Sequence, residues 1–403
     1  MINRELLEVI YKAASIQRWN DHIRPHRGFT ELDKQSHKMI YAYILGKMEE
    51  TDRGASVDWC ALIEGGIFEF LQRIKLTDLK PTVFHRLMEH KSRELNEWVL
   101  RELSGAIGDI GNNFKEKCTA YLLCPEPRSL ERRILKAAHY LATDWEFRII
   151  YHLNSPLYGL EETRKEIENQ IEEHYDLAGV QKIVLGKKTH DFLDLVGQLR
   201  FQQRWGQSPR IPETSVMGHM LVVAMLTFFY SNQLGACDKR VYNNFFAGLF
   251  HDLPEVLTRD IVSPVKRSVP GLEDLIKDIE KDQIRERILP LLPELWHSEV
   301  LYFIQEEFQN KIIQDTGIQF VTSSEISDKY NDDRFSPLDG ELVKMCDQVA
   351  AFVEASMSIE FGLKIPDLVI GQRQIFENCS EKTVSGLSFR DVFYLFNAFN
   401  QEE

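Results

Sequence analysis

Hydrophobic and polar positions follow the period of an α-helix along most of the chain. Apolar residues recur at three- and four-residue spacing in long segments, which places them on one face of a helix. The two-residue alternation of a half-buried strand is scarce, and its best example is VQKIVLG at residues 180–186. We therefore predict an all-α helical bundle. Helices are predicted for residues 3–17, 131–149, 161–176, 189–203, 219–232, 273–291 and 341–358.

The pattern also repeats within the chain. The segment LLEVIYKAASIQRW at residues 6–19 matches FLDLVGQLRFQQRW at 192–205, and both end in Gln-Arg-Trp. Two further pairs follow in the same order, which is hard to attribute to chance. These pairs are 61–73 with 247–259 and 134–142 with 342–350. We predict two related helical domains, at residues 1–155 and 189–403, joined by a connection at 156–188.

The two halves differ at polar positions. The first half keeps the scaffold pattern but lacks a cluster of titratable residues found in the second. We therefore expect the first domain to be a degenerate copy that supports the second one, shapes its cleft or replaces a dimer partner. The residues of the second half and their counterparts in the first half are His251 and Gly65, Asp252 and Gly66, Asp347 and His139, and His219 and His37.

Charge and composition limit the functional class. The chain has 403 residues and a net charge of −14, which argues against binding long nucleic acid through its phosphates. The six cysteines form no CxxC pair, so neither a zinc knuckle nor a disulfide framework is indicated. The N-terminal segment does not resemble a signal peptide, and the longest apolar run, at 220–230, is too short to span a bilayer. We expect a cytoplasmic protein.

Residues 245–266, FFAGLFHDLPEVLTRDIVSPVK, place titratable side chains in an apolar setting. Burying such groups without partners is costly, so each other, solvent or a metal ion should pair with them. Imidazole and carboxylate groups together suit a divalent ion. Pro254 removes a helical hydrogen bond and could bend the chain so that the two side chains before it converge. The four candidate ligands are His219, His251, Asp252 and Asp347.

This motif set resembles the HD-domain metal-dependent phosphohydrolases, most closely the branch of bacterial 5′-deoxynucleotidases. The resemblance covers roughly residues 190–365 and lies in six elements that occur in the expected order. One departure is the sequence Met-Gly-His-Met at 217–220, where that family often has an acid and a hydroxyl beside the histidine. The six elements are Arg204-Trp205, His219, His251-Asp252, Glu255, Asp260 and Asp347.

The resemblance implies a helical bundle in which the four candidate ligands hold one divalent ion, which could be Mn, Co, Mg, Zn or Fe. Glu255 would orient or deprotonate the attacking water or protonate the leaving group, and Asp260 would lie near the phosphate or a sugar hydroxyl. Arg204 would neutralise phosphate oxygens, Trp205 would pack on the sugar or base, and Lys266 is a further candidate phosphate contact.

The expected substrate is a (deoxy)nucleoside 5′-monophosphate or a similar small phosphoester. Two alternatives stay open: a hydrolase of nucleoside triphosphates or cyclic nucleotides, and a nucleotide-sensing or scaffolding protein with little turnover. Taken alone, Arg204-Trp205 fits equally well a helix end with a packing tryptophan. We expect no membrane partner and leave open a homodimer.

Overall fold

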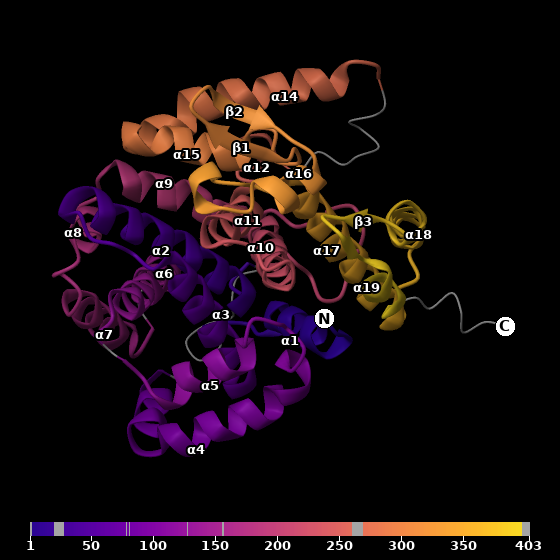
Figure 1. Cartoon of the computed structure of the whole chain (residues 1–403). Helices are drawn as coiled ribbons and strands as arrows, with labels where there is room; N and C mark the ends of the chain where they lie inside the picture. Colours follow the sequence, from indigo (N-terminus) through magenta and orange to yellow (C-terminus); the bar gives the residue numbers. More distant parts are fainter. Residues whose placement is uncertain are drawn as a thin grey trace. The chain divides into compact units, whose positions relative to one another are not determined.

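The structure is a computed structural model in which helices dominate (Figure 1). The prediction of an all-α protein is confirmed, and each of the predicted helices overlaps a helix of the structure. Within the described residues, no helix has the length and apolar character needed to cross a membrane. The structure describes residues 2–19, 28–77, 79, 81–126, 128–154, 157–259 and 269–396.

The chain forms two compact units. Unit 1 comprises Met1–Tyr11, Ala106–Phe114 and Gln202–Glu403, and unit 2 comprises Lys12–Gly105 and Lys115–Phe201. These units are defined by packing, whereas the boundaries predicted at residues 155 and 189 were placed by the sequence repeat. The predicted domain division therefore stays a prediction.

Unit 1 is built around α10 (Val216–Gln233), in which every residue from Val216 to Asn232 is buried. A helix that is apolar on all sides belongs in a core, and α10 packs against both α11 (Asp238–Phe250) and α17 (Gly340–Glu360). Its first turn is capped by Ser215, whose hydroxyl accepts the Gly218 N–H at 2.9 Å. The core of unit 1 therefore brings α17 together with α10 and α11, which lie much earlier in the sequence.

Unit 1 also contains the remaining helices named below and two short antiparallel hairpins, β1–β2 and β3–β4. The hairpins were not predicted, because their strands have only two to four residues. The other helices are α1 (Arg4–Lys12), α12 (Glu255–Thr258), α14 (Leu272–Gln283), α15 (Glu294–Ile304), α16 (Ser323–Lys329), α18 (Pro366–Cys379) and α19 (Arg390–Tyr394), and the strands are β1 (Lys311–Gln314), β2 (Gly317–Phe320), β3 (Thr383–Val384) and β4 (Leu387–Ser388).

Unit 2 is arranged around α2 (Glu31–Arg53), which is also buried along most of its length and packs against α6 (Leu130–Asn154). The segment at 180–186, the best example of strand-like alternation in the sequence, forms no strand, because Ala178–Val184 is helix α8. Val180 and Ile183 are its buried side chains, and their three-residue spacing fits a helix rather than a strand. The other helices are α3 (Trp59–Leu76), α4 (Pro81–Ile107), α5 (Phe114–Leu123), α7 (Leu160–Glu172) and α9 (Lys188–Gly197).

Candidate metal centre in unit 1

Three of the four candidate ligands converge in the core of unit 1. His219 lies in the first turns of α10, His251 directly follows α11, and Asp347 lies in α17. One ligand atom of each residue lies within 4.8 Å of those of the other two. The shortest of these contacts joins His219 Nε2 to Asp347 Oδ1 at 2.9 Å.

A close approach of two helices brings the histidines together. A Cβ atom at Gly248 would lie only 2.9 Å from the Ala224 Cα atom, so a residue with a side chain would push α11 away from α10. Gly248 lies one turn before His251 and also accepts a hydrogen bond from His251 Nδ1 at 2.8 Å. This bond leaves Nε2 facing the site, and the two imidazole rings lie 5.5 Å apart between centroids.

The fourth candidate ligand, Asp252, lies beside His251. Its Oδ2 lies 3.2 Å from His251 Nε2, yet neither atom makes a hydrogen bond of acceptable geometry. Buried polar atoms of this kind normally have a partner, and here both are potential metal ligands. The structure therefore brings three of the predicted ligands together and places Asp252 beside His251, and these imidazole and carboxylate groups suit a divalent ion.

The candidate ligands shift one another's pKa values. Burial lowers the pKa of His251, but the Asp252 carboxylate beside it outweighs burial and raises that pKa to about 9. Burial would raise the pKa of Asp252 and Asp347, whereas the neighbouring His251 and His219 hold each carboxyl group below its ordinary pKa. The carboxylates thus stay ionised and attract a cation.

Arg204 lies beside both carboxylates. Its NH1 atom is 3.9 Å from Asp252 Oδ2, and its NH2 atom is 3.8 Å from Asp347 Oδ1. These distances are longer than a direct hydrogen bond, and the side chain is 15% exposed. A guanidinium group placed in this way could contact an anion that approaches the two carboxylates and their ion.

Comparison with known proteins gives the family. The family model described as HD domain matches residues 196–375, the segment that contains all four candidate ligands. Residues 196–375 of the chain are therefore similar to an HD domain. The prediction of an HD-domain fold related to the 5′-deoxynucleotidases is therefore confirmed.

Three curated 5′-deoxynucleotidases are similar to this chain. The protein of Vibrio atlanticus is 27% identical over 132 residues, and that of Photobacterium profundum is 26% identical over 132 residues. Each of these alignments covers 31% of this chain and 65% of the relative. The protein of Pasteurella multocida is 24% identical over 182 residues, which are 43% of this chain and 77% of the relative.

Trp205 in the HD domain has a structural contact. Its indole N–H donates to Glu354 Oε2 at 3.1 Å, and its ring lies against Gly371, where a Cβ atom would come within 2.8 Å. Its φ of 56° is rare for a bulky residue. These contacts favour the packing alternative for Trp205, and its role beside a substrate stays a prediction.

Glu354 is a residue that the sequence analysis missed. It is fully buried, and its Oε1 lies 3.6 Å from His219 Nδ1, the ring nitrogen that does not face Asp347. Thr214 Oγ1 donates to the same carboxylate at 2.7 Å. Burial would raise the pKa of Glu354, but Arg210 and His219 lower it well below its ordinary value. The seven-residue spacing from Asp347 was the available signal, because it places both acids on one face of α17.

Of the other predicted site residues in the HD domain, some lie outside the described residues. Glu255 begins α12 and is 8% exposed, and its backbone carbonyl accepts a hydrogen bond from Gln202 at 3.1 Å. Asp260 and Lys266 lie outside the described residues. A further carboxylate, Glu307, was not predicted, and burial raises its pKa while the nearby His251 lowers it.

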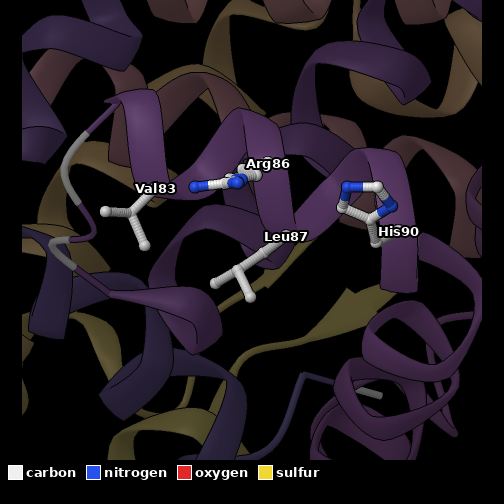
Figure 2. Close-up of a pocket in the computed structure, with 4 residues that line it drawn as sticks. All are labelled: Val83, Arg86, Leu87 and His90. Atoms are coloured by element: carbon white, nitrogen blue, oxygen red, sulfur yellow. The ribbon is translucent and has the colours of Figure 1, made fainter.

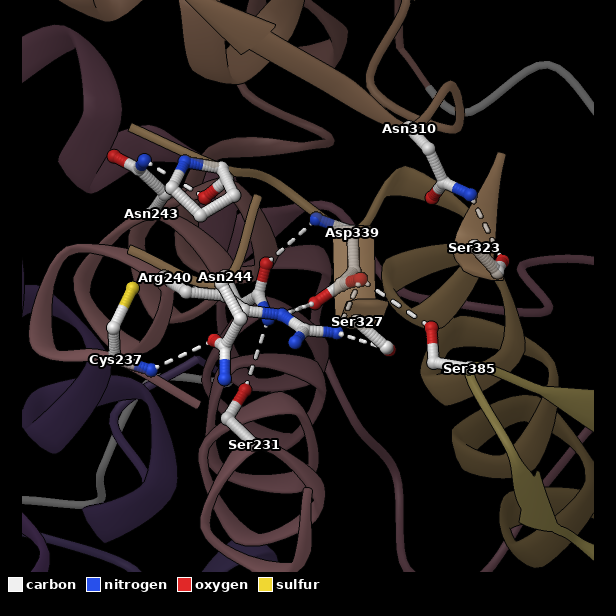
Figure 3. Close-up of polar contacts among 12 residues, drawn as sticks. Ser231, Cys237, Arg240, Asn243, Asn244, Asn310, Ser323, Ser327, Asp339 and Ser385 are labelled. Carbon is white, nitrogen blue, oxygen red and sulfur yellow. Dashed lines mark hydrogen bonds and ion pairs between the residues drawn. The ribbon is translucent and has the colours of Figure 1, made fainter. Parts of the chain in front are cut away.

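A buried polar network connects α11, which His251 directly follows, with α17, which holds Asp347 (Figure 3). Asp339, directly before α17, accepts two hydrogen bonds from Arg240, at 2.7 and 2.9 Å. Asn244 donates to the same carboxylate and accepts the Asp339 N–H, both at 2.8 Å. Arg240 and Asn244 lie one turn apart on α11, so the network fixes how α11 and α17 lie against each other.

A separate hollow of about 500 Å³ lies on α4 in unit 2 (Figure 2). None of the predicted site residues that the structure describes lines it. It is lined by Val83, Arg86, Leu87 and His90.

Proposed function

We propose that the HD domain of this chain is a metal-dependent phosphohydrolase that acts on a (deoxy)nucleoside 5′-monophosphate or a similar small phosphoester. The observation that supports this most directly is the convergence of His219, His251 and Asp347, whose ligand atoms lie within 4.8 Å of one another. The similarity to three 5′-deoxynucleotidases supports the substrate class.

The protein's part is to hold the ion and position the phosphate. His219, His251, Asp252 and Asp347 would hold one divalent ion, which when bound supplies a more acidic water and a Lewis acid for phosphoryl oxygens. The carboxylates of Asp252 and Asp347 would supply the negative charge that a divalent ion needs. Its native identity among Mn, Co, Mg, Zn and Fe is open.

Positive charge near the ion serves the substrate. The Arg204 guanidinium lies within 3.8–3.9 Å of Asp252 and Asp347, so it can reach phosphate oxygens bound at the same ion. Phosphoryl transfer depends mainly on such positioned charge and on an aligned nucleophile. We assign Lys266 a second phosphate contact.

Proton transfer needs a carboxylate that is not a ligand. We assign it to Glu255, which follows His251 by four residues and is buried at the start of α12. A carboxylate there could orient or deprotonate the water and later protonate the leaving alkoxide. Asp260 would contact the phosphate or a sugar hydroxyl.

Phosphate release from a panel of nucleotides tests the proposal. The panel holds ribo- and deoxynucleoside 5′-monophosphates, triphosphates and cyclic nucleotides, each with Mn, Co, Mg, Zn or Fe. We expect release from monophosphates by the wild-type protein, none by Asp252→Ala, and unchanged release by Asp328→Ala, an exposed control on α16. Nucleotides that raise the melting temperature without any release would favour the sensor alternative, and equal activity of Asp252→Ala would exclude the proposed site.

A further inference from the structure

Unit 2 repeats the local structure that precedes the metal centre in unit 1. In unit 1, Gln203 and Ser215 form an isolated β-bridge, and Arg204 N–H donates to the Thr214 carbonyl at 3.0 Å. In unit 2, Gln17 and Thr30 form the same kind of bridge. The counterparts also share a detail that bulky residues rarely adopt: Trp19 has a φ of 67° and Trp205 one of 56°.

The correspondence continues on a later helix. Trp19 Nε1 donates to Glu146 Oε2 at 2.8 Å, just as Trp205 Nε1 donates to Glu354 Oε2 at 3.1 Å. Glu146 on α6 therefore occupies the position of Glu354 on α17. Counting back seven residues from each glutamate gives His139 in unit 2 and Asp347 in unit 1.

The position of His219 is taken by a lysine. Thr30 caps α2 and Ser215 caps α10, and the fourth residues after these caps are Lys34 and His219. Lys34 Nζ contacts His139 Nδ1, just as His219 contacts Asp347. The structure therefore supports Lys34, rather than His37, as the counterpart of His219.

The other two ligand positions in unit 2 are filled. In the sequence repeat, Gly65 corresponds to His251 and Gly66 corresponds to Asp252. A Cβ atom at Gly65 would lie 2.9 Å from Leu135 Cδ1, and one at Gly66 would collide with the Met39 sulfur. Apolar side chains thus occupy the space that ligands would need, and no carboxylate remains among the four positions.

The charges around Lys34 are predominantly positive. Arg18 pairs with Glu31 at 2.9 Å and with Glu146 at 2.8 Å, and Lys38 pairs with Glu69. Lys34 is fully buried, and no carboxylate oxygen of the described residues lies within 4.0 Å of its Nζ. The cluster holds the basic residues Arg18, Lys34, Lys38, Arg73 and Arg200 and the acidic residues Glu31, Glu69 and Glu146.

A buried amine without a counter-ion is costly. Burial lowers the pKa of Lys34 well below its ordinary value, and Arg18 and Lys38 act in the same direction against Glu31. An anion beside Nζ would offset this cost through charge-assisted hydrogen bonds. The cluster reaches the surface at Glu69, which is 30% exposed, and at Arg73, which is 18% exposed.

We propose that unit 2 binds the phosphate group of a small phosphorylated ligand without a metal, with Lys34 as the central contact and Arg18, Lys38 and Arg73 around it. In unit 1 the corresponding positions present two carboxylates to a cation, whereas in unit 2 they present an ammonium group to an anion. The second half of the repeat would thus catalyse, and the first half would sense phosphate or a phosphorylated compound. This site is separate from the catalytic centre proposed above.

The test uses the full chain with the metal centre disabled. Asp347→Ala protein is kept in a chelator, and inorganic phosphate is titrated by calorimetry and by the rise in melting temperature. We expect one binding event in this parent, and Lys34→Met in the same background should weaken it about 10–100-fold, the range expected for a charge-assisted hydrogen bond. Lys47→Met, on the same helix α2, serves as the matched control and should bind like the parent.

The outcomes separate this proposal from the proposed catalysis, because the readout needs no turnover. Absence of binding to the Asp347→Ala parent, or equal binding by the Lys34→Met variant, would overturn it. Methionine fills the lysine's volume without its charge, so circular dichroism should show the same helix content. Should that variant misfold, Arg73→Gln at the exposed rim provides the second measurement, and undiminished binding there would equally contradict the site.

Discussion

The carboxylate of Glu354 lies 3.6 Å from Nδ1 of His219, while the opposite nitrogen of the same ring lies 2.9 Å from Asp347. The imidazole is therefore held between two acids of α17 that lie two turns apart. A histidine that holds a metal through one nitrogen is commonly oriented by a carboxylate at the other. In the proposed metal site, Glu354 would orient His219 so that Nε2 faces the ion.

Glu354→Gln should weaken metal binding about 10–100-fold, because the amide keeps the shape of the side chain but loses the charge that orients His219. Competition with a calibrated chelator measures this affinity. The control Glu341→Gln changes an exposed acid on the same helix and should leave affinity unchanged. Equal affinities for both variants would remove Glu354 from the site.

Asp347→Asn should abolish tight metal binding, since it removes one of two anionic ligands. Adding the metal should raise the melting temperature of the wild-type protein. At a metal concentration a hundredfold above Kd, binding should add about 2.7 kcal/mol to the free energy of unfolding. Elemental analysis and melting curves check both effects. A variant that retains stoichiometric metal and the full rise in melting temperature would show that the ion is held elsewhere.

Arg204→Met should have opposite effects on binding and turnover. The guanidinium near Asp252 and Asp347 repels a cation, so its loss should tighten metal binding. Loss of the phosphate contact should lower kcat/KM about 100-fold, since such a contact is worth a few kcal/mol. Arg204→Lys should restore only part of the activity, because an ammonium lacks the planar fork. Parallel loss of metal and activity would instead indicate a structural role for Arg204.

Asp339→Asn should destabilise unit 1 by about 3–5 kcal/mol, because it leaves the buried Arg240 without its counter-ion. Urea unfolding monitored by circular dichroism measures the change. The double variant Arg240→Met, Asp339→Leu removes both charges and should recover most of the stability. No recovery would mean that the network contributes through its hydrogen bonds to Asn244 rather than through the ion pair.

Glu31 in unit 2 should make stability depend on pH. Burial would raise its pKa, but Arg18 and Arg73 lower it from 4.5 to about 2. Because the folded pKa lies below the unfolded one, the ionised carboxylate stabilises the fold above pH 4.5, and this contribution is lost as the pH falls toward 2. Between pH 6 and pH 3.5, the free energy of unfolding should fall by about 1.4 kcal/mol more in the wild type than in Glu31→Gln.

Denaturant unfolding at several pH values gives this difference. The control Glu172→Gln changes an exposed acid at the end of α7 and should follow the wild-type curve. A Glu31→Gln curve that runs parallel to the wild type over the whole range would contradict the lowered pKa.

Individual residues show how far the sequence could predict the fold. The long amphipathic segments became helices such as α6 and α17, because a three- to four-residue period is a local property of the chain. The strand-like alternation at 180–186 did not become a strand, since seven residues show too few turns to distinguish the two periods. The hairpins were missed for the same reason.

The sequence alone determined the helical class and the identity of the candidate ligands, because the period of apolar residues and the order of motifs can be read along the chain. Only the tertiary structure decided that Glu354 faces the second nitrogen of His219. It also decided that Lys34, not His37, takes the position in unit 2 that corresponds to His219 in unit 1. These relationships depend on helix rotation and on the contacts between distant segments. Side chains far apart in sequence meet only when the core packs, so spacing along the chain does not encode them directly.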